Sequence, residues 1–143
     1  MNTNSRHVVD ATIVKENENA ARRAYERSDF VLCFLLSHAL IESLLRAFLG
    51  QTGRESFNEL IAAYKNYMKT EGQISATFIK ELTTFNWRRN KVVHQLWKNG
   101  YSVTNEKLEP ACRSAFMMFG LFIEWLETFD PEITESGFEY EKE

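Results

Sequence analysis

The segment from residue 30 to residue 49 constrains the fold of this chain more than any other. Its residues are apolar on nearly all sides of a helix, which predicts a central helix buried among other helices. His38, Glu42 and Arg46 introduce polar groups into this segment, so we do not expect it to cross a membrane. A helix of this kind needs neighbours on several faces, and the rest of the chain has to supply them.

Amphipathic patterns precede and follow this segment. Asp10 fits the N-cap of a first helix. Ser28-Asp29 marks a break or kink before the central helix, which Gly50 ends. Apolar residues recur at helical spacing between these signals, with charged residues between them. The pattern predicts a first helix and a central helix with a break or kink between them.

Two further helices are expected in the middle of the chain. Ser56 and Glu59 form a capping box that opens a third helix, which Gly72 closes. A fourth helix begins near Ser75 and continues to the Asn-Gly pair that ends at Gly100.

The last helix is expected to begin after a short preliminary turn. Thr104 or Asn105 fits its N-cap, and Pro110 is tolerated only within about the first turn of a helix. No segment alternates with the period of a strand. The sequence therefore predicts an all-α fold, an up-and-down bundle of four to five helices that forms one domain over residues 1–129.

Charge is unevenly distributed along the chain. The net charge is −3, and residues 130–143 hold six acidic residues and one lysine, or −5. Subtracting −5 from −3 leaves +2 on residues 1–129, so the acidic balance does not argue against a nucleic-acid ligand. We expect residues 130–143 to form a flexible acidic tail.

Cysteine usage and the N-terminus indicate a cytoplasmic protein. Cys33 and Cys112 both lie within apolar helical patterns, which is typical of reduced core thiols rather than of a disulfide framework. The first five residues are polar and carry no apolar stretch of the kind that a signal peptide needs.

The stretch from Trp87 to His94 concentrates chemically useful side chains. His94 could take or give a proton, and Arg89 offers a planar fork of donors for phosphate. Asn90 could hold either a phosphate oxygen or the imidazole. These three side chains would suit RNA cleavage by the neighbouring 2′-hydroxyl, a reaction that needs no metal or cofactor when acid, base and cation are present.

Helix geometry separates two of these residues. Five positions along an ideal helix rotate by about 500°, so Arg89 and His94 lie roughly 140° apart. The site would need a break in the helix, an arginine that reaches around it, or a second protomer. In a symmetric dimer two such stretches facing each other would supply two histidines, one as base and one as acid.

Neighbouring cations and aromatics have two interpretations each. Arg88, Lys91 and Lys98 would contact RNA phosphates, or they are solvated side chains of a basic helix face. Trp87, Trp97 and Tyr101 could stack on bases, although packing in the core or in a dimer interface is the commoner role and the one that we expect.

Two other groups of residues stand out. The spacing of His38 and Glu42 could hold a metal ion, but no second pair of ligands is evident, and we expect a buried, hydrogen-bonded polar pair in which Glu42 reaches Arg46. The apolar residues between Phe116 and Phe122 exceed what one core face needs, and part of this stripe could form a dimer contact.

The run Arg89-Asn90-Lys91-Val92-Val93-His94 resembles the signature of HEPN-domain ribonucleases, an arginine, a polar residue and a histidine four to six positions after the arginine. The segments 24–30 and 37–42 are similar to the first helical hairpin of that family. With the order of helices, the resemblance covers roughly residues 10–129.

The resemblance implies a HEPN-like helical homodimer that cleaves RNA without metal in a cleft between protomers. Many such proteins are toxins or defence effectors that a cognate antitoxin protein holds inactive. Toxins inactivated by nucleotidyltransferases often carry a tyrosine two residues after the histidine, whereas this chain has Leu96 there. The alternative hypothesis is a non-catalytic helical module that binds RNA or a protein partner.

Overall fold

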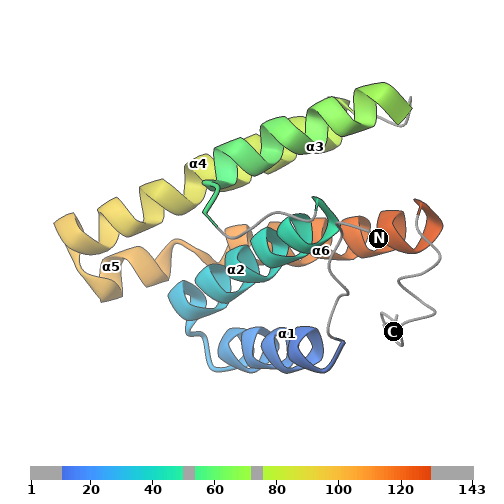
Figure 1. The fold of residues 1–143 in the computed structure, drawn as a ribbon. Coiled ribbons are helices and arrows are strands. Elements are labelled where there is room, and N and C mark those ends of the chain that lie inside the picture. Colours follow the sequence, from blue (N-terminus) through green and yellow to red (C-terminus); the bar gives the residue numbers. More distant parts are fainter. Residues whose placement is uncertain (1–10, 50–53, 72–75, 130–143) are drawn as a thin grey trace.

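The computed structural model describes residues 11–49, 54–71 and 76–129, and in these ranges the chain forms helices and no strand (Figure 1). The expected all-α fold is confirmed. The described helices number six, one more than the largest number expected, because a short helix forms a separate element before the last long one. They are α1 (Ala11–Glu26), α2 (Phe30–Leu49), α3 (Phe57–Glu71), α4 (Ala76–Asn99), α5 (Tyr101–Glu106) and α6 (Glu109–Phe129).

Helix α2 occupies the centre of the fold, as its sequence predicts. It contacts α1, α3, α4, α5 and α6, and Phe34, Ile41 and Leu45 on it are completely buried. Figure 1 shows α1 beneath α2, the antiparallel pair α3 and α4 above it, and α6 alongside it. By length and composition alone α2 could cross a membrane, but half of that window is buried inside the protein, as in a core helix.

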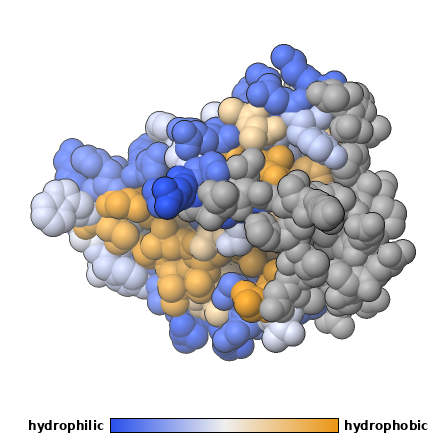
Figure 2. Space-filling view, in the orientation of Figure 1, coloured by the Kyte–Doolittle hydropathy of each residue, from blue (hydrophilic) through white to orange (hydrophobic). Residues whose placement is uncertain are grey.

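Part of α2 nevertheless faces solvent. Leu32 is 39% exposed, and Figure 2 shows hydrophobic surface over the region where α2 lies in Figure 1. Hydrophilic side chains border this region in the same view. The described helices therefore leave one side of the central helix incompletely covered.

The turn between α1 and α2 confirms the break expected at Ser28-Asp29. The Ser28 N–H donates to the Tyr25 carbonyl at 2.9 Å and the Asp29 N–H donates to the Ala24 carbonyl at 2.8 Å, which closes the end of α1. Ser28 adopts a left-handed conformation, with φ of 63°, at the position where such turns usually carry glycine.

The capping box at the start of α3 is also confirmed. The Glu59 N–H donates to Ser56 Oγ at 3.1 Å, and the Ser56 N–H donates to Glu59 Oε1 at 2.8 Å. The other predicted signals Asp10, Gly50, Gly72 and Ser75, and the tail over residues 130–143, lie outside the described residues.

The start of the last helix differs from the prediction. Thr104 and Asn105 lie within α5 and do not cap α6, which begins at Glu109. Asn105 instead bonds across the fold, because its Oδ1 accepts from the Val31 N–H at 2.9 Å and its Nδ2 donates to the Ser28 carbonyl at 2.8 Å. Pro110 lies in the first turn of α6, after the short helix, as the sequence predicts.

Two cysteines join α2 to α6. Cys33 and Cys112 are both free and completely buried, as expected for core thiols. Cys112 Sγ donates to the Phe30 carbonyl at 3.2 Å, and a hydrogen bond with Cys33 together with burial raises the pKa of the Cys112 thiol. The same hydrogen bond lowers the pKa of the Cys33 thiol, so only the Cys112 thiol is held in its protonated form by the pair.

Candidate nucleic-acid interface on α4

The basic stretch predicted from the sequence lies on α4, in a helix that continues without a break from Ala76 to Asn99. Val92 is buried and marks the side of α4 that packs on the core. Arg89 is half-buried next to that side, and its Nη1 donates to Asn90 Oδ1 at 2.9 Å. The predicted pair of Arg89 and Asn90 is thus in contact, at the surface of the helix.

His94 lies on a different side of α4. Its side chain is exposed, whereas the other described histidine, His38, is buried. Because α4 is a continuous helix, the rotation of roughly 140° between Arg89 and His94 applies to this chain. One copy of the protein therefore does not direct both side chains to a common point along the helix surface.

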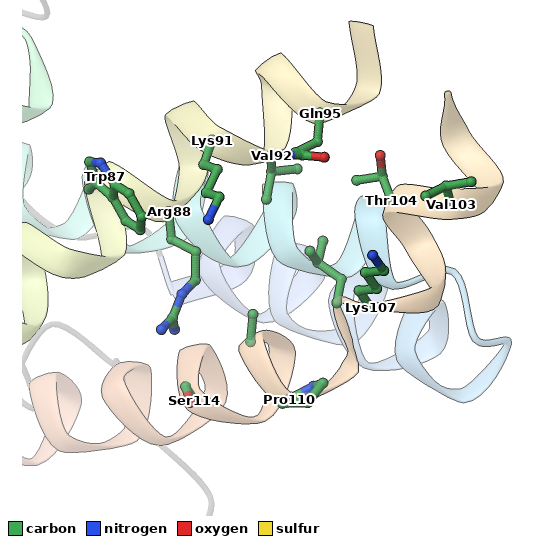
Figure 3. Close-up of a pocket in the computed structure, with 12 residues that line it drawn as sticks. Trp87, Arg88, Lys91, Val92, Gln95, Val103, Thr104, Lys107, Pro110 and Ser114 are labelled. Atoms are coloured by element: carbon green, nitrogen blue, oxygen red, sulfur yellow. The ribbon is translucent and has the colours of Figure 1, made fainter. Parts of the chain in front are cut away.

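A cleft opens beside the stretch, between α4, α5 and α6. Its volume is about 530 Å³, which is within the range of small-ligand sites. Figure 3 shows Arg88 and Lys91 extending from α4 into this space, above Pro110 and Ser114 of α6. The twelve lining residues are Trp87, Arg88, Lys91, Val92, Gln95, Val103, Thr104, Lys107, Leu108, Pro110, Ala111 and Ser114.

Only two of the three predicted phosphate contacts line the cleft. Arg88 and Lys91 line it, whereas Lys98 is exposed on α4 and does not. Lys107, from the turn after α5, lines it too and was not singled out from the sequence. No local pattern marks this lysine as a site residue, since only the return of the chain through α5 brings it opposite α4.

The aromatic residues beside the stretch lie on the surface of the single chain, so they do not pack in its core; the packing in a dimer interface that was also expected stays a prediction. Trp87 is 60% exposed and Trp97 88% exposed. Lys91 Nζ lies 5.0 Å from the centre of the Trp87 ring, a cation–π contact. Tyr101 is also exposed, and its hydroxyl donates to Asp29 Oδ1 at 2.6 Å. Two large indole surfaces are thereby available next to the cations.

A polar chain runs beneath Arg89. His38 Nε2 lies 3.3 Å from Asn86 Oδ1, and Asn86 Nδ2 donates to Asn58 Oδ1 at 3.0 Å, which links α2, α4 and α3. The imidazole of His38 is only 3% exposed. Burial lowers the pKa of His38 to about 4, against the hydrogen bond with Asn86, and the nearby charge of Arg89 lowers it further.

Glu42 takes part in a different set of contacts. It accepts from Arg46 at 2.6 Å, as the sequence predicts, and Arg46 also bonds to Glu55 at 3.2 Å. Glu42 Oε1 also lies 3.8 Å from His38 Nδ1, but burial still lowers the pKa of His38 to about 4. At neutral pH His38 is therefore an uncharged structural group, and its contact with Glu42 is not an ion pair.

Comparison of the chain with protein-family models, with curated protein sequences and with solved structures gives no match in any of the three. Within the residues that the structure describes, no group of three or more His, Cys, Asp or Glu side chains could hold a metal ion. The residues of α4 and the cleft beside it therefore form the candidate site.

Proposed function

We propose that this protein is a metal-independent endoribonuclease that acts as a homodimer, with Arg89 and His94 essential and Asn90 supporting. The observation that carries the proposal is the surface of α4, where Arg89, Asn90 and an exposed His94 lie on one unbroken helix beside a cationic cleft. His94 supplies proton transfer for attack by the 2′-hydroxyl, and Arg89 stabilises charge that develops on the phosphate. No cofactor is needed for this chemistry.

The helical arrangement supports the resemblance to HEPN domains. The consecutive helices α1 and α2, followed by the pair α3 and α4, are compatible with an up-and-down bundle of HEPN type, with the motif on the fourth helix. In that family the site forms between two protomers. The angular separation of Arg89 and His94 supports the same arrangement here. One helix does not direct both side chains to a common point, so a second copy would supply the other half of the site.

Exposed apolar side chains next to the motif support a contact between two copies. Val93 is 47% exposed and Trp97 lies one turn further along α4. The incompletely covered side of α2 and the exposed Met117 of α6 add further apolar surface. A dimer that buries such side chains gains about 25 cal/mol for each Å² removed from water.

The biological role that we propose is that of a cytoplasmic toxin or defence effector, held inactive by a cognate antitoxin protein. Leu96, which stands where related toxins carry a modifiable tyrosine, is partly buried against the core. Control by modification at that position is therefore not part of the proposal.

A second candidate is a helical module that binds RNA without cutting it. It is favoured by one observation, since the cleft collects Arg88, Lys91 and Lys107 but neither Arg89 nor His94. Binding would then be electrostatic and strongly salt-dependent, and no cleavage would accompany it.

The test is RNA cleavage in excess chelator by the wild-type protein and by His94→Ala and Arg89→Ala. We expect both substitutions to lower the rate by at least about a hundredfold, because a general acid–base group contributes roughly 10²–10⁴. Lys80→Ala is the matched control, because Lys80 is exposed on the same helix and has no proposed role in the site. Circular dichroism checks that each variant is folded. Normal cleavage by His94→Ala refutes the catalytic proposal.

Mixing variants tests the composite site. If each site needs His94 from both copies, a ninefold excess of His94→Ala should lower the activity of a fixed amount of wild-type protein to about one tenth, since most wild-type chains then pair with an inactive copy. If single chains are active, the added variant leaves the rate unchanged, and the dimeric site is wrong.

A further inference from the structure

We infer that the cleft between α4, α5 and α6 binds one nucleotide unit of single-stranded RNA, with phosphate held by Arg88, Lys91 and Lys107 and the base against Trp87. The choice of RNA as the source of the nucleotide rests on the proposed function. The site itself is separate from the Arg89 and His94 pair, because neither lines the cleft.

The charge of the cleft points to an anionic ligand. Three of its twelve lining residues are cationic and none is acidic, although the whole chain carries a net charge of −3. Like charges gathered around one cavity repel one another, so the arrangement is most stable when an anion occupies it. Arg88, Lys91 and Lys107 form no salt bridge with any described residue, so no described carboxylate neutralises their charges.

The acidic side chain that precedes Pro110 is turned to partners outside the cleft. Glu109 adjoins Pro110 in the first turn of α6 but does not line the cleft. Its carboxylate accepts a hydrogen bond from the Tyr25 hydroxyl and pairs with Arg113 Nε at 2.8 Å. The cleft thus keeps its positive charge even though an acid stands next to it in the sequence.

The shape of the cleft suits a nucleotide better than a bare phosphate. Its floor includes Val92, 3% exposed, and Leu108, 8% exposed, so an apolar surface underlies the charged rim. A volume of about 530 Å³ is larger than a simple anion needs. Figure 3 shows Lys107 and Thr104 toward the α5 end and Trp87 at the other end, which separates a cation from the aromatic ring.

Trp87 provides the surface for the base. Its ring is largely exposed, and Lys91 lies over it at 5.0 Å from the ring centre. This contact fixes a cation next to a π surface, which is the combination that a phosphate and its base require. Base–aromatic stacking tolerates every base, so we expect the cleft to bind RNA with little sequence preference.

The test measures binding of a short single-stranded RNA of mixed sequence that carries 2′-O-methyl groups, so that binding is followed without cleavage by 2′-hydroxyl attack. We expect Lys107→Glu to raise the Kd at least about tenfold and Trp87→Ala at least about fivefold. Lys80→Glu makes the same charge change at an exposed position of α4 outside the cleft, and we expect it to alter the Kd less than about twofold. Equal effects of Lys107→Glu and Lys80→Glu overturn the inference.

A second variant guards against a folding defect in the first. Ser114→Glu places a negative charge in the cleft from α6, whereas Ser102→Glu places one on the exposed side of α5 outside it. Only the former should weaken binding. Adenosine 5′-monophosphate should compete with the RNA, weakly, and adenosine still more weakly. A monophosphate that binds as tightly as the RNA would instead indicate a free nucleotide as ligand and overturn the assignment to RNA.

The nucleotide-binding cleft and the ribonuclease activity can be refuted independently of each other. If His94→Ala abolishes cleavage while Lys107→Glu leaves binding unchanged, the cleft assignment is wrong and the ribonuclease stands. If Lys107→Glu abolishes binding and the wild-type protein cuts no RNA, the cleft is supported and the enzyme is refuted.

Discussion

Replacing His38 with glutamine should remove a pH dependence of stability that the buried imidazole creates. Burial lowers the pKa of His38 in the folded protein to about 4, whereas the unfolded chain takes up its proton near pH 6.5. Between these values the unfolded state binds more protons than the folded state. The contribution is therefore fully present above about pH 6.5 and is lost as the pH falls toward 4.

The size of the effect follows from the two pKa values. A shift from 6.5 to about 4 corresponds to a stabilisation of about 3 kcal/mol at most, because each pKa unit is worth about 1.4 kcal/mol. Most of this difference is lost in the interval from about pH 7 to about pH 4.5, a loss of about 2 kcal/mol. His38 is only 3% exposed, so solvent screening reduces this figure little.

Urea unfolding followed by circular dichroism measures the effect, at one protein concentration and at several pH values in this interval. Glutamine does not titrate, and its amide can still bond to Asn86. Carboxylates titrate in both proteins, so subtracting the free energies of unfolding cancels them to first order. The free energy of unfolding of the wild-type protein, minus that of His38→Gln, should fall by about 2 kcal/mol as the pH falls across this interval. Curves that stay parallel across the interval refute the reasoning.

Two further predictions concern helix ends. Ser56→Ala should lower the free energy of unfolding by about 1 kcal/mol, because the Glu59 N–H loses its acceptor. Lys65→Ala, at an exposed position in the middle of the same helix, should have a smaller effect, and equal losses would contradict the capping role. Ser28→Gly should raise the free energy of unfolding by up to about 1 kcal/mol, since glycine adopts the left-handed conformation without strain, and thermal unfolding that shows a loss instead would argue against strain at Ser28.

Local signals in the sequence were sufficient for much of the fold. The apolar run of α2 had to be buried whatever its neighbours were, and the capping box at Ser56 is formed within four consecutive residues. The break at Ser28-Asp29 also arises from local backbone bonds. Each of these features depends on interactions at short sequence separation, which a pattern in the sequence records directly.

Features that depend on distant residues were not predictable in the same way. Asn105 was expected to cap the helix that follows it, but it bonds to the backbone of Ser28 and Val31, more than seventy positions earlier in the chain. Trp97 was expected to pack in the core or in a dimer contact, and it is 88% exposed in the single chain. Helical periodicity gives the side of a helix on which a residue lies, but not which neighbour covers that side.

The candidate site also combines residues that the sequence singled out with residues that only the fold brings together. Arg88 and Lys91 were singled out because they stand together in the sequence, and both line the cleft. Lys107 and Ser114 come from other elements and complete it only after α5 redirects the chain. The roles assigned to Arg89 and His94 stay predictions, and their separation of roughly 140° around α4 is the geometric reason to examine two copies together.

The two buried thiols can report how often the folded protein opens. Cys33 on α2 and Cys112 on α6 are inaccessible to solvent, so an alkylating reagent can reach them only when these two helices part. The rate of labelling in native buffer, followed by mass spectrometry, therefore reports how often the centre of the fold opens. A ligand or second copy that holds α2 and α6 together would slow that rate, without any probe having to be attached to the protein.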